Sequence, residues 1–70
     1  MEGFVMRMQR EKRELYHKIQ RLTRFLSAQS KEGYPDISTD ELFLIGQQLA
    51  HMTEYYKILD KRIVMHIIDL

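Results

Sequence analysis

The chain has 70 residues, three histidines, no cysteine and a net charge of +1. It therefore cannot form a disulfide scaffold, and its histidines lack the spacing of a metal site, so we expect no metal and no other cofactor. A chain of this length makes one domain (1–70), which can bury only part of its apolar surface.

The first predicted element is a helix over residues 4–27. Apolar side chains recur every three or four residues along it, and Lys12 interrupts the series, which contains Val5, Met8, Leu15, Ile19, Leu22 and Leu26. This spacing predicts a helix with one apolar seam. A lysine within a seam sets the register of an assembly, faces a wet cavity or meets a bound phosphate.

The same helix carries a basic stripe away from the seam, made of Arg10, Arg13, His17, Arg21 and Arg24. Up to Lys31 the chain has eight Lys or Arg and three Glu, a balance of +5, whereas the remainder has a balance of −4. Such a stripe either binds phosphate groups or forms a solvated face that acidic residues partly neutralise. Duplex DNA is not an expected partner, because the whole chain is almost neutral and has no helix-turn-helix pattern.

Residues 28–38 form the predicted connection, in which Gly33, Pro35 and Asp36 favour a turn. Ser38 and Glu41 then make an S-x-x-E capping box, which predicts a second helix over residues 39–67. Its seam contains Leu42, Ile45, Leu49, Met52, Tyr56, Leu59 and Ile63. Gly46 costs a helix about 1 kcal/mol relative to alanine, so we expect another helix to cross closely at that position.

These elements predict an all-α fold, in which two long antiparallel helices form a helical hairpin that assembles into a compact homo-oligomer. The apolar end of the second helix, residues 63–68, is too short to cross a bilayer. We therefore expect a cytoplasmic protein with no membrane partner. The sequence shows no nucleophile motif, Gly-rich loop or ligand cluster, so it does not predict an enzyme.

Two longer patterns resemble a known family. The first helix reads E-L-x-x-K-I-x-x-L-x-x-F from Glu14 to Phe25, and the second reads Q-L-x-x-M-x-x-Y-x-x-I-L-x-x-R-I from Gln48 to Ile63. Both are similar to the helices of small phage proteins known as anti-CBASS sponges, which share a helical-hairpin domain with a Thoeris anti-defence family.

The resemblance implies a homo-oligomer, commonly a hexamer, that binds cyclic di- and trinucleotides between subunits and sequesters them without breaking a bond. In the family, an aromatic residue near the start of the first helix stacks on a base, and a lysine further along meets phosphate. The matching positions here are Phe4 and Lys18. Phe4 can instead anchor an interface, and Arg62 is a second candidate phosphate contact or an intersubunit ion-pair residue.

Two other functions stay open. The hairpin could be a small adaptor that binds a protein partner through Tyr55, Ile58 and the apolar end of the second helix. Alternatively, Arg10, Arg13, Arg21 and Arg24 could bind nucleic acid weakly, with an affinity that falls steeply as salt rises.

Overall fold

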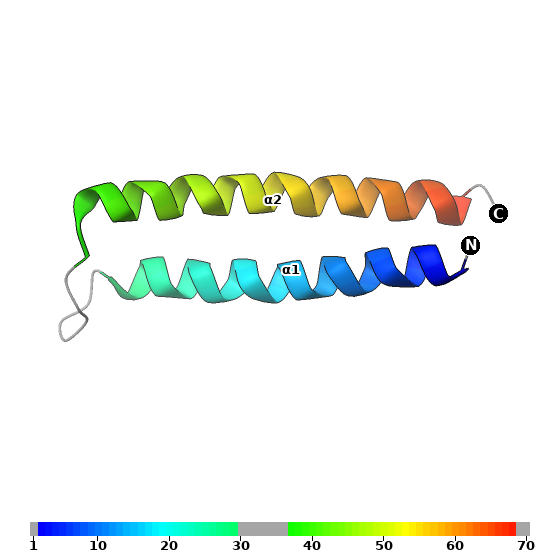
Figure 1. Cartoon of the computed structure of the whole chain (residues 1–70), viewed down its shortest axis with the longest axis horizontal. Helices are drawn as coiled ribbons and strands as arrows, with labels where there is room; N and C mark the ends of the chain where they lie inside the picture. The colour runs from blue at the N-terminus through cyan, green and yellow to red at the C-terminus, as the bar shows by residue number, and fades with distance from the viewer. Residues whose placement is uncertain (1, 30–36, 69–70) are drawn as a thin grey trace.

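The computed structural model describes residues 2–29 and 37–68. Two helices, α1 (Glu2–Ala28) and α2 (Thr39–Ile68), run antiparallel side by side (Figure 1). The described part of the chain contains no strand, so the predicted all-α helical hairpin is confirmed. α1 begins two residues earlier and ends one residue later than expected, and α2 ends one residue later. The turn predicted at Gly33, Pro35 and Asp36 lies outside the described residues.

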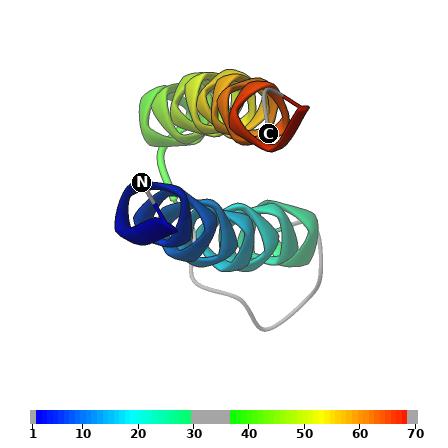
Figure 2. The same ribbon diagram turned by 90° about the vertical axis from the view of Figure 1, so that its right-hand side faces the viewer.

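The two predicted apolar seams face each other and form the core. The buried side chains are Met8, Leu15 and Ala28 of α1 and Ile45, Leu59 and Ile63 of α2. All other seam residues are half-buried. Figure 2 looks along the hairpin and shows that, among the residues the structure describes, no third element lies over the outer faces of the two helices. The described part measures 51 × 18 × 14 Å, so the core is a single layer of side chains between the two helices.

Ser38 defines where α2 begins. Its Oγ accepts a hydrogen bond from the Glu41 amide at 3.1 Å, and its carbonyl accepts one from the Leu42 amide at 3.0 Å. The side-chain bond is the serine half of the predicted capping box. Asp40 and Glu41 also place negative charge in the first turn, where the helix dipole favours it.

Gly46 does not mark a crossing of the two helices, and in that respect the sequence-based expectation is wrong for the hairpin itself. A Cβ built on Gly46 has no atom of α1 within 4 Å. The reason is rotational, because Gly46 lies roughly 100° further round the helix than Ile45, which faces α1.

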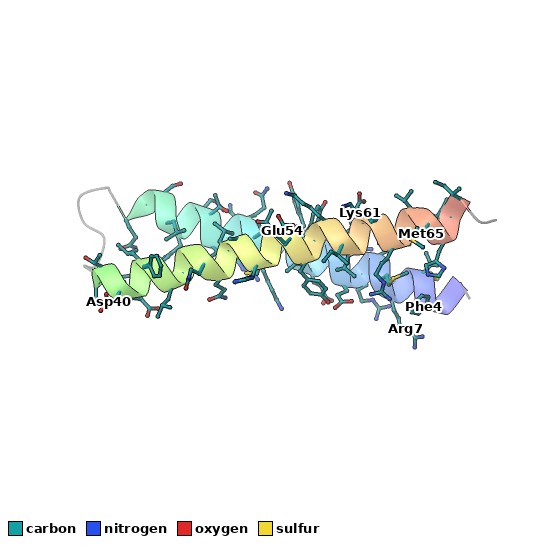
Figure 3. The ribbon with its side chains drawn as sticks, turned by 90° about the horizontal axis from the view of Figure 1, so that it is seen from above. Phe4, Arg7, Asp40, Glu54, Lys61 and Met65 are labelled. Atoms are coloured by element: carbon teal, nitrogen blue, oxygen red, sulfur yellow. The ribbon has the colours of Figure 1, made fainter. Side chains whose placement is uncertain are left out.

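A second apolar row runs along the exposed surface of α2. It comprises Leu44, Tyr55, Ile58 and Met65, whose side chains are 57%, 41%, 53% and 61% exposed. Their spacing of eleven, three and seven residues keeps them on one face of the helix. Figure 3 views the hairpin from the α2 side and shows Met65 at the same end as Phe4 and Arg7. Within the described residues α1 leaves this row largely exposed, although the Tyr55 hydroxyl donates a hydrogen bond to Glu11 of α1. We call these four residues the α2 apolar row.

Candidate ligand-binding grooves

The hairpin has two grooves between α1 and α2, on opposite sides of the seam. A helix turns roughly 100° per residue, so Tyr16 lies to one side of the buried Leu15 and Lys18 lies to the other. Each groove takes its floor from the core and its walls from polar residues of both helices.

The first groove, which we call the Lys18 groove, has a volume of about 280 Å³. It is lined by Lys18, Arg21, Leu22 and Phe25 of α1 and by Gln48 and Met52 of α2. Within the described residues, neither Lys18 nor Arg21 has an ion-pair partner. The groove therefore offers two free cations beside a phenyl ring and a carboxamide, which suits a ligand with both negative charge and an aromatic ring.

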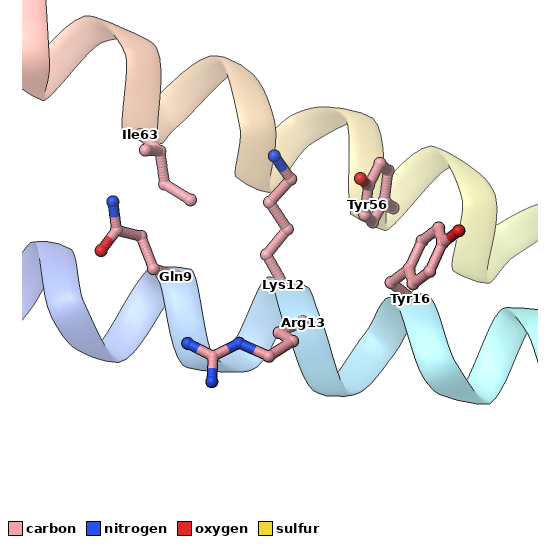
Figure 4. A pocket seen from close by; sticks show the side chains of 6 residues that line it. All are labelled: Gln9, Lys12, Arg13, Tyr16, Tyr56 and Ile63. Carbon is pink, nitrogen blue, oxygen red and sulfur yellow. The ribbon is translucent and has the colours of Figure 1, made fainter.

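The second groove, which we call the tyrosine groove, has a volume of about 440 Å³ (Figure 4). It is lined by Gln9, Lys12, Arg13 and Tyr16 of α1 and by Tyr56 and Ile63 of α2. The ring centroids of Tyr16 and Tyr56 lie 6.1 Å apart, with the planes tilted by 41°. Lys12 extends from α1 toward α2, and its Nζ lies 5.3 Å from the centroid of the Tyr56 ring. This distance is within the range of a cation–π contact.

Lys12 is not a free cation. Its Nζ donates a hydrogen bond to Asp60 Oδ1 at 2.6 Å, and the two side chains are 28% and 50% exposed. This hydrogen bond raises the pKa of Lys12 above its ordinary value, while partial burial acts in the opposite direction. Of the three roles considered for a lysine in the seam, the structure favours the one in which Lys12 faces a solvent-accessible groove.

Phe4 and Arg62 lie together near the ends of the chain. The Arg62 guanidinium carbon lies 5.8 Å from the centroid of the Phe4 ring, and the His66 ring packs edge-on against Phe4 at 5.2 Å. Lys18 is fourteen residues from Phe4 along α1, a separation of roughly 21 Å. Within one hairpin, Phe4 and Arg62 are therefore in contact, whereas Lys18 lies in a different place.

The basic stripe remains exposed along α1. In the described part of the chain, none of its members forms an ion pair, and Arg21 and Arg13 border different grooves. The stripe is therefore divided between two sites. Sequence reasoning placed Tyr56 in the core and missed its approach to Tyr16, because that contact depends on how the two helices are aligned.

Two further properties of the described residues concern other classes of function. No three His, Asp or Glu side chains come together as metal ligands would. Neither helix combines the length and the hydropathy that a membrane span requires.

Residues 2–65 match a family model described as Sequestin, a name that is consistent with a sequestering role. No curated protein and no solved structure matches the chain. Because the matched segment is nearly the entire chain, the protein belongs to the Sequestin family.

Proposed function

We propose that this member of the Sequestin family is a non-catalytic sponge, which holds cyclic di- or trinucleotides between the subunits of a homo-oligomer. By keeping the intact messenger away from its effector, it would serve a phage against host defence, as its resemblance to the anti-CBASS sponges suggests. The family match over residues 2–65 supports binding rather than catalysis as the activity.

The observation that carries this proposal is the pair of free cations in the Lys18 groove. Lys18 and Arg21 stand beside Phe25 with no carboxylate to neutralise them among the described residues. A phosphodiester is bound well by charge-assisted hydrogen bonds from such cations, and a base stacks on an aromatic face. The same α1 position was indicated independently by the E-L-x-x-K pattern.

The proposal requires a second subunit, because a single Lys18 groove is only half a site. Its volume of about 280 Å³ falls below the range of about 300–1,000 Å³ that is usual for small-molecule sites. A neighbouring hairpin that packs on the α2 apolar row would enclose the groove. Phe4 and Arg62 of that neighbour then supply the base-stacking ring and a second phosphate contact.

The test is a titration calorimetry panel of cyclic dinucleotides and trinucleotides, with linear dinucleotides as controls, at physiological salt. We expect tight binding of at least one cyclic species. Lys18→Ala should weaken that binding by about tenfold or more, because it removes a hydrogen bond between charged groups. Arg24→Ala is the matched control, since it removes the same charge from an exposed position of α1 that borders neither groove.

Light scattering on each variant separates a binding defect from an assembly defect. If Lys18→Ala causes the oligomer to dissociate, Lys18 is a structural residue. Equal losses of affinity in Lys18→Ala and Arg24→Ala would show that binding depends on the overall positive charge of α1 and not on the Lys18 groove. If no cyclic nucleotide binds the wild-type protein, the sponge hypothesis is wrong for these ligands and the adaptor hypothesis takes its place.

A further inference from the structure

The tyrosine groove has a feature that the Lys18 groove lacks, because one of the two cations that line it, Lys12, is paired with a carboxylate. Lys12 lies in the wall of the groove, and Asp60 holds its ammonium at 2.6 Å. Both side chains remain partly exposed, so a molecule entering the groove can reach the ion pair. The groove is also the larger of the two, at about 440 Å³.

We propose that the tyrosine groove is a second binding site, for a planar aromatic ring that carries a phosphate, and that Asp60 competes with this phosphate for Lys12. The proposal concerns different residues from those of the Lys18 groove and does not depend on cyclic ligands.

The ring preference follows from the two tyrosines. Tyr16 comes from α1 and Tyr56 from α2, and their tilted rings open toward the groove with centroids 6.1 Å apart. Aromatic rings pair favourably in offset or edge-on geometry at centroid distances of about 4.5–7 Å. A planar ligand can therefore pack on Tyr16, which is 44% exposed, while Gln9 is available for hydrogen bonds to the ligand's polar edge.

The phosphate preference follows from the two cations and from their unequal availability. Arg13 lines the groove without an ion-pair partner in the described part of the chain, whereas Lys12 is engaged by Asp60. Figure 4 shows Lys12 reaching toward α2 between Ile63 and Tyr56, with the Arg13 guanidinium remaining beside α1. A phosphate can bind Arg13 directly. To bind Lys12 as well, it must either displace the Asp60 carboxylate or share the Lys12 ammonium with it. Asp60 thus lowers the affinity of the groove for anions.

The decisive variant is Asp60→Asn, tested with guanosine 5′-monophosphate as the probe in titration calorimetry. We expect the probe to bind this variant about tenfold more tightly than it binds the wild-type protein, because the freed lysine gains a charge-assisted hydrogen bond. Glu54→Gln is the matched control. Glu54 is also a carboxylate of α2 in an ion pair with a lysine, Lys57, at 3.2 Å, but Lys57 does not line the groove, whereas Lys12 does.

Further ligands and variants define the two halves of the site. Guanosine, which lacks the phosphate, and ribose 5-phosphate, which lacks the ring, should both bind the Asp60→Asn variant more weakly than the nucleotide does. Lys12→Met combined with Asp60→Asn should lose the gain in affinity, and Tyr16→Ala should weaken binding. Circular dichroism verifies that each variant keeps its helical content.

Methyl NMR locates the bound probe, since each groove contains a methyl group of its own. Ile63 lines the tyrosine groove, and Met52 lines the Lys18 groove. We expect the nucleotide to shift the Ile63 signal in a Lys18→Ala background and to leave Met52 unaffected. The proposal is wrong if the probe does not bind, if Asp60→Asn and Glu54→Gln behave alike, or if only Met52 responds. Failure of this proposal leaves the proposed function standing, because binding of cyclic nucleotides at the Lys18 groove is measured separately with Lys18→Ala and Arg24→Ala.

Discussion

Lys12 shows how one side chain can belong to a core and to a polar site. Its position repeats with the apolar residues of α1, so its methylene stem packs along the seam while its ammonium reaches a polar partner. That partner, Asp60, is 48 residues away in the chain. A methionine would fill similar space without the charge, so Lys12→Met separates the packing role from the electrostatic one.

We predict that the ion pair of Lys12 with Asp60 stabilises the hairpin at neutral pH and ceases to do so in alkali. Because Asp60 raises the pKa of Lys12 in the folded chain, the stabilisation is complete below the ordinary lysine pKa of about 10.4 and is lost as the pH rises through the higher folded value. Solvent screens a pair this exposed, so its contribution should not exceed about 1 kcal/mol.

Thermal melts of the wild-type protein and of Lys12→Met across the pH range test this prediction. The difference between the two melting temperatures should stay constant from pH 6 to pH 9, by the same linkage argument, and change in favour of the variant only above about pH 10. A difference that instead changed near neutral pH would show that another group controls the effect.

At the scale of the element, the start of α2 depends on one serine. Ser38 satisfies the Glu41 amide, which otherwise has no partner within the helix. We predict that Ser38→Ala destabilises the protein by about 1 kcal/mol, the usual cost of losing such a cap. Urea denaturation at fixed protein concentration measures this free energy of unfolding.

Ser38→Asp is the control for that experiment, because aspartate also accepts the hydrogen bond and adds a favourable charge at the helix start. It should unfold at a urea concentration equal to or above that of the wild-type protein. If alanine and aspartate destabilise equally, the stability of α2 does not depend on this cap.

At the scale of the whole molecule, the described hairpin leaves many large apolar side chains exposed to solvent. Ten large hydrophobic side chains in the described residues are more than 40% exposed, and Leu59 alone is fully enclosed there. Exposed apolar surface of this extent is typical of an interaction site. Since burial of such side chains drives association, the α2 apolar row is the part of the surface where another hairpin is expected.

We predict that the protein assembles through the α2 apolar row and that Ile58→Glu converts it to smaller species, because this change places a charge in the middle of the row, where Ile58 is 53% exposed. Ala50→Glu adds the same charge on a different exposed face of α2 and should leave the molar mass unchanged. Light scattering coupled to size-exclusion chromatography measures both. An unchanged mass for Ile58→Glu would exclude this row as the interface.

What the sequence determined by itself was local. The recurrence of apolar residues predicted both helices, and every seam residue that it selected is buried or half-buried, because helical periodicity depends only on neighbours along the chain. Ala28, which is also buried, had been placed in the connection. The Ser38 cap was predictable for the same reason, since its donor is three residues away. Phe4, Lys18 and Arg62 were selected by resemblance, and the roles assigned to them stay predictions.

What only the tertiary structure decided was which residues of α1 meet which residues of α2. The pairing of Tyr16 with Tyr56, of Lys12 with Asp60 and of Phe4 with Arg62 depends on one quantity, the alignment of the two helices along their shared seam. The apolar seam specifies which face is buried but repeats every turn or two, so sliding one helix past the other by a repeat would keep the seam and change every polar pairing. The alignment is set by how the buried side chains interlock, with Leu59 enclosed between the helices, and that packing is a property of the folded hairpin.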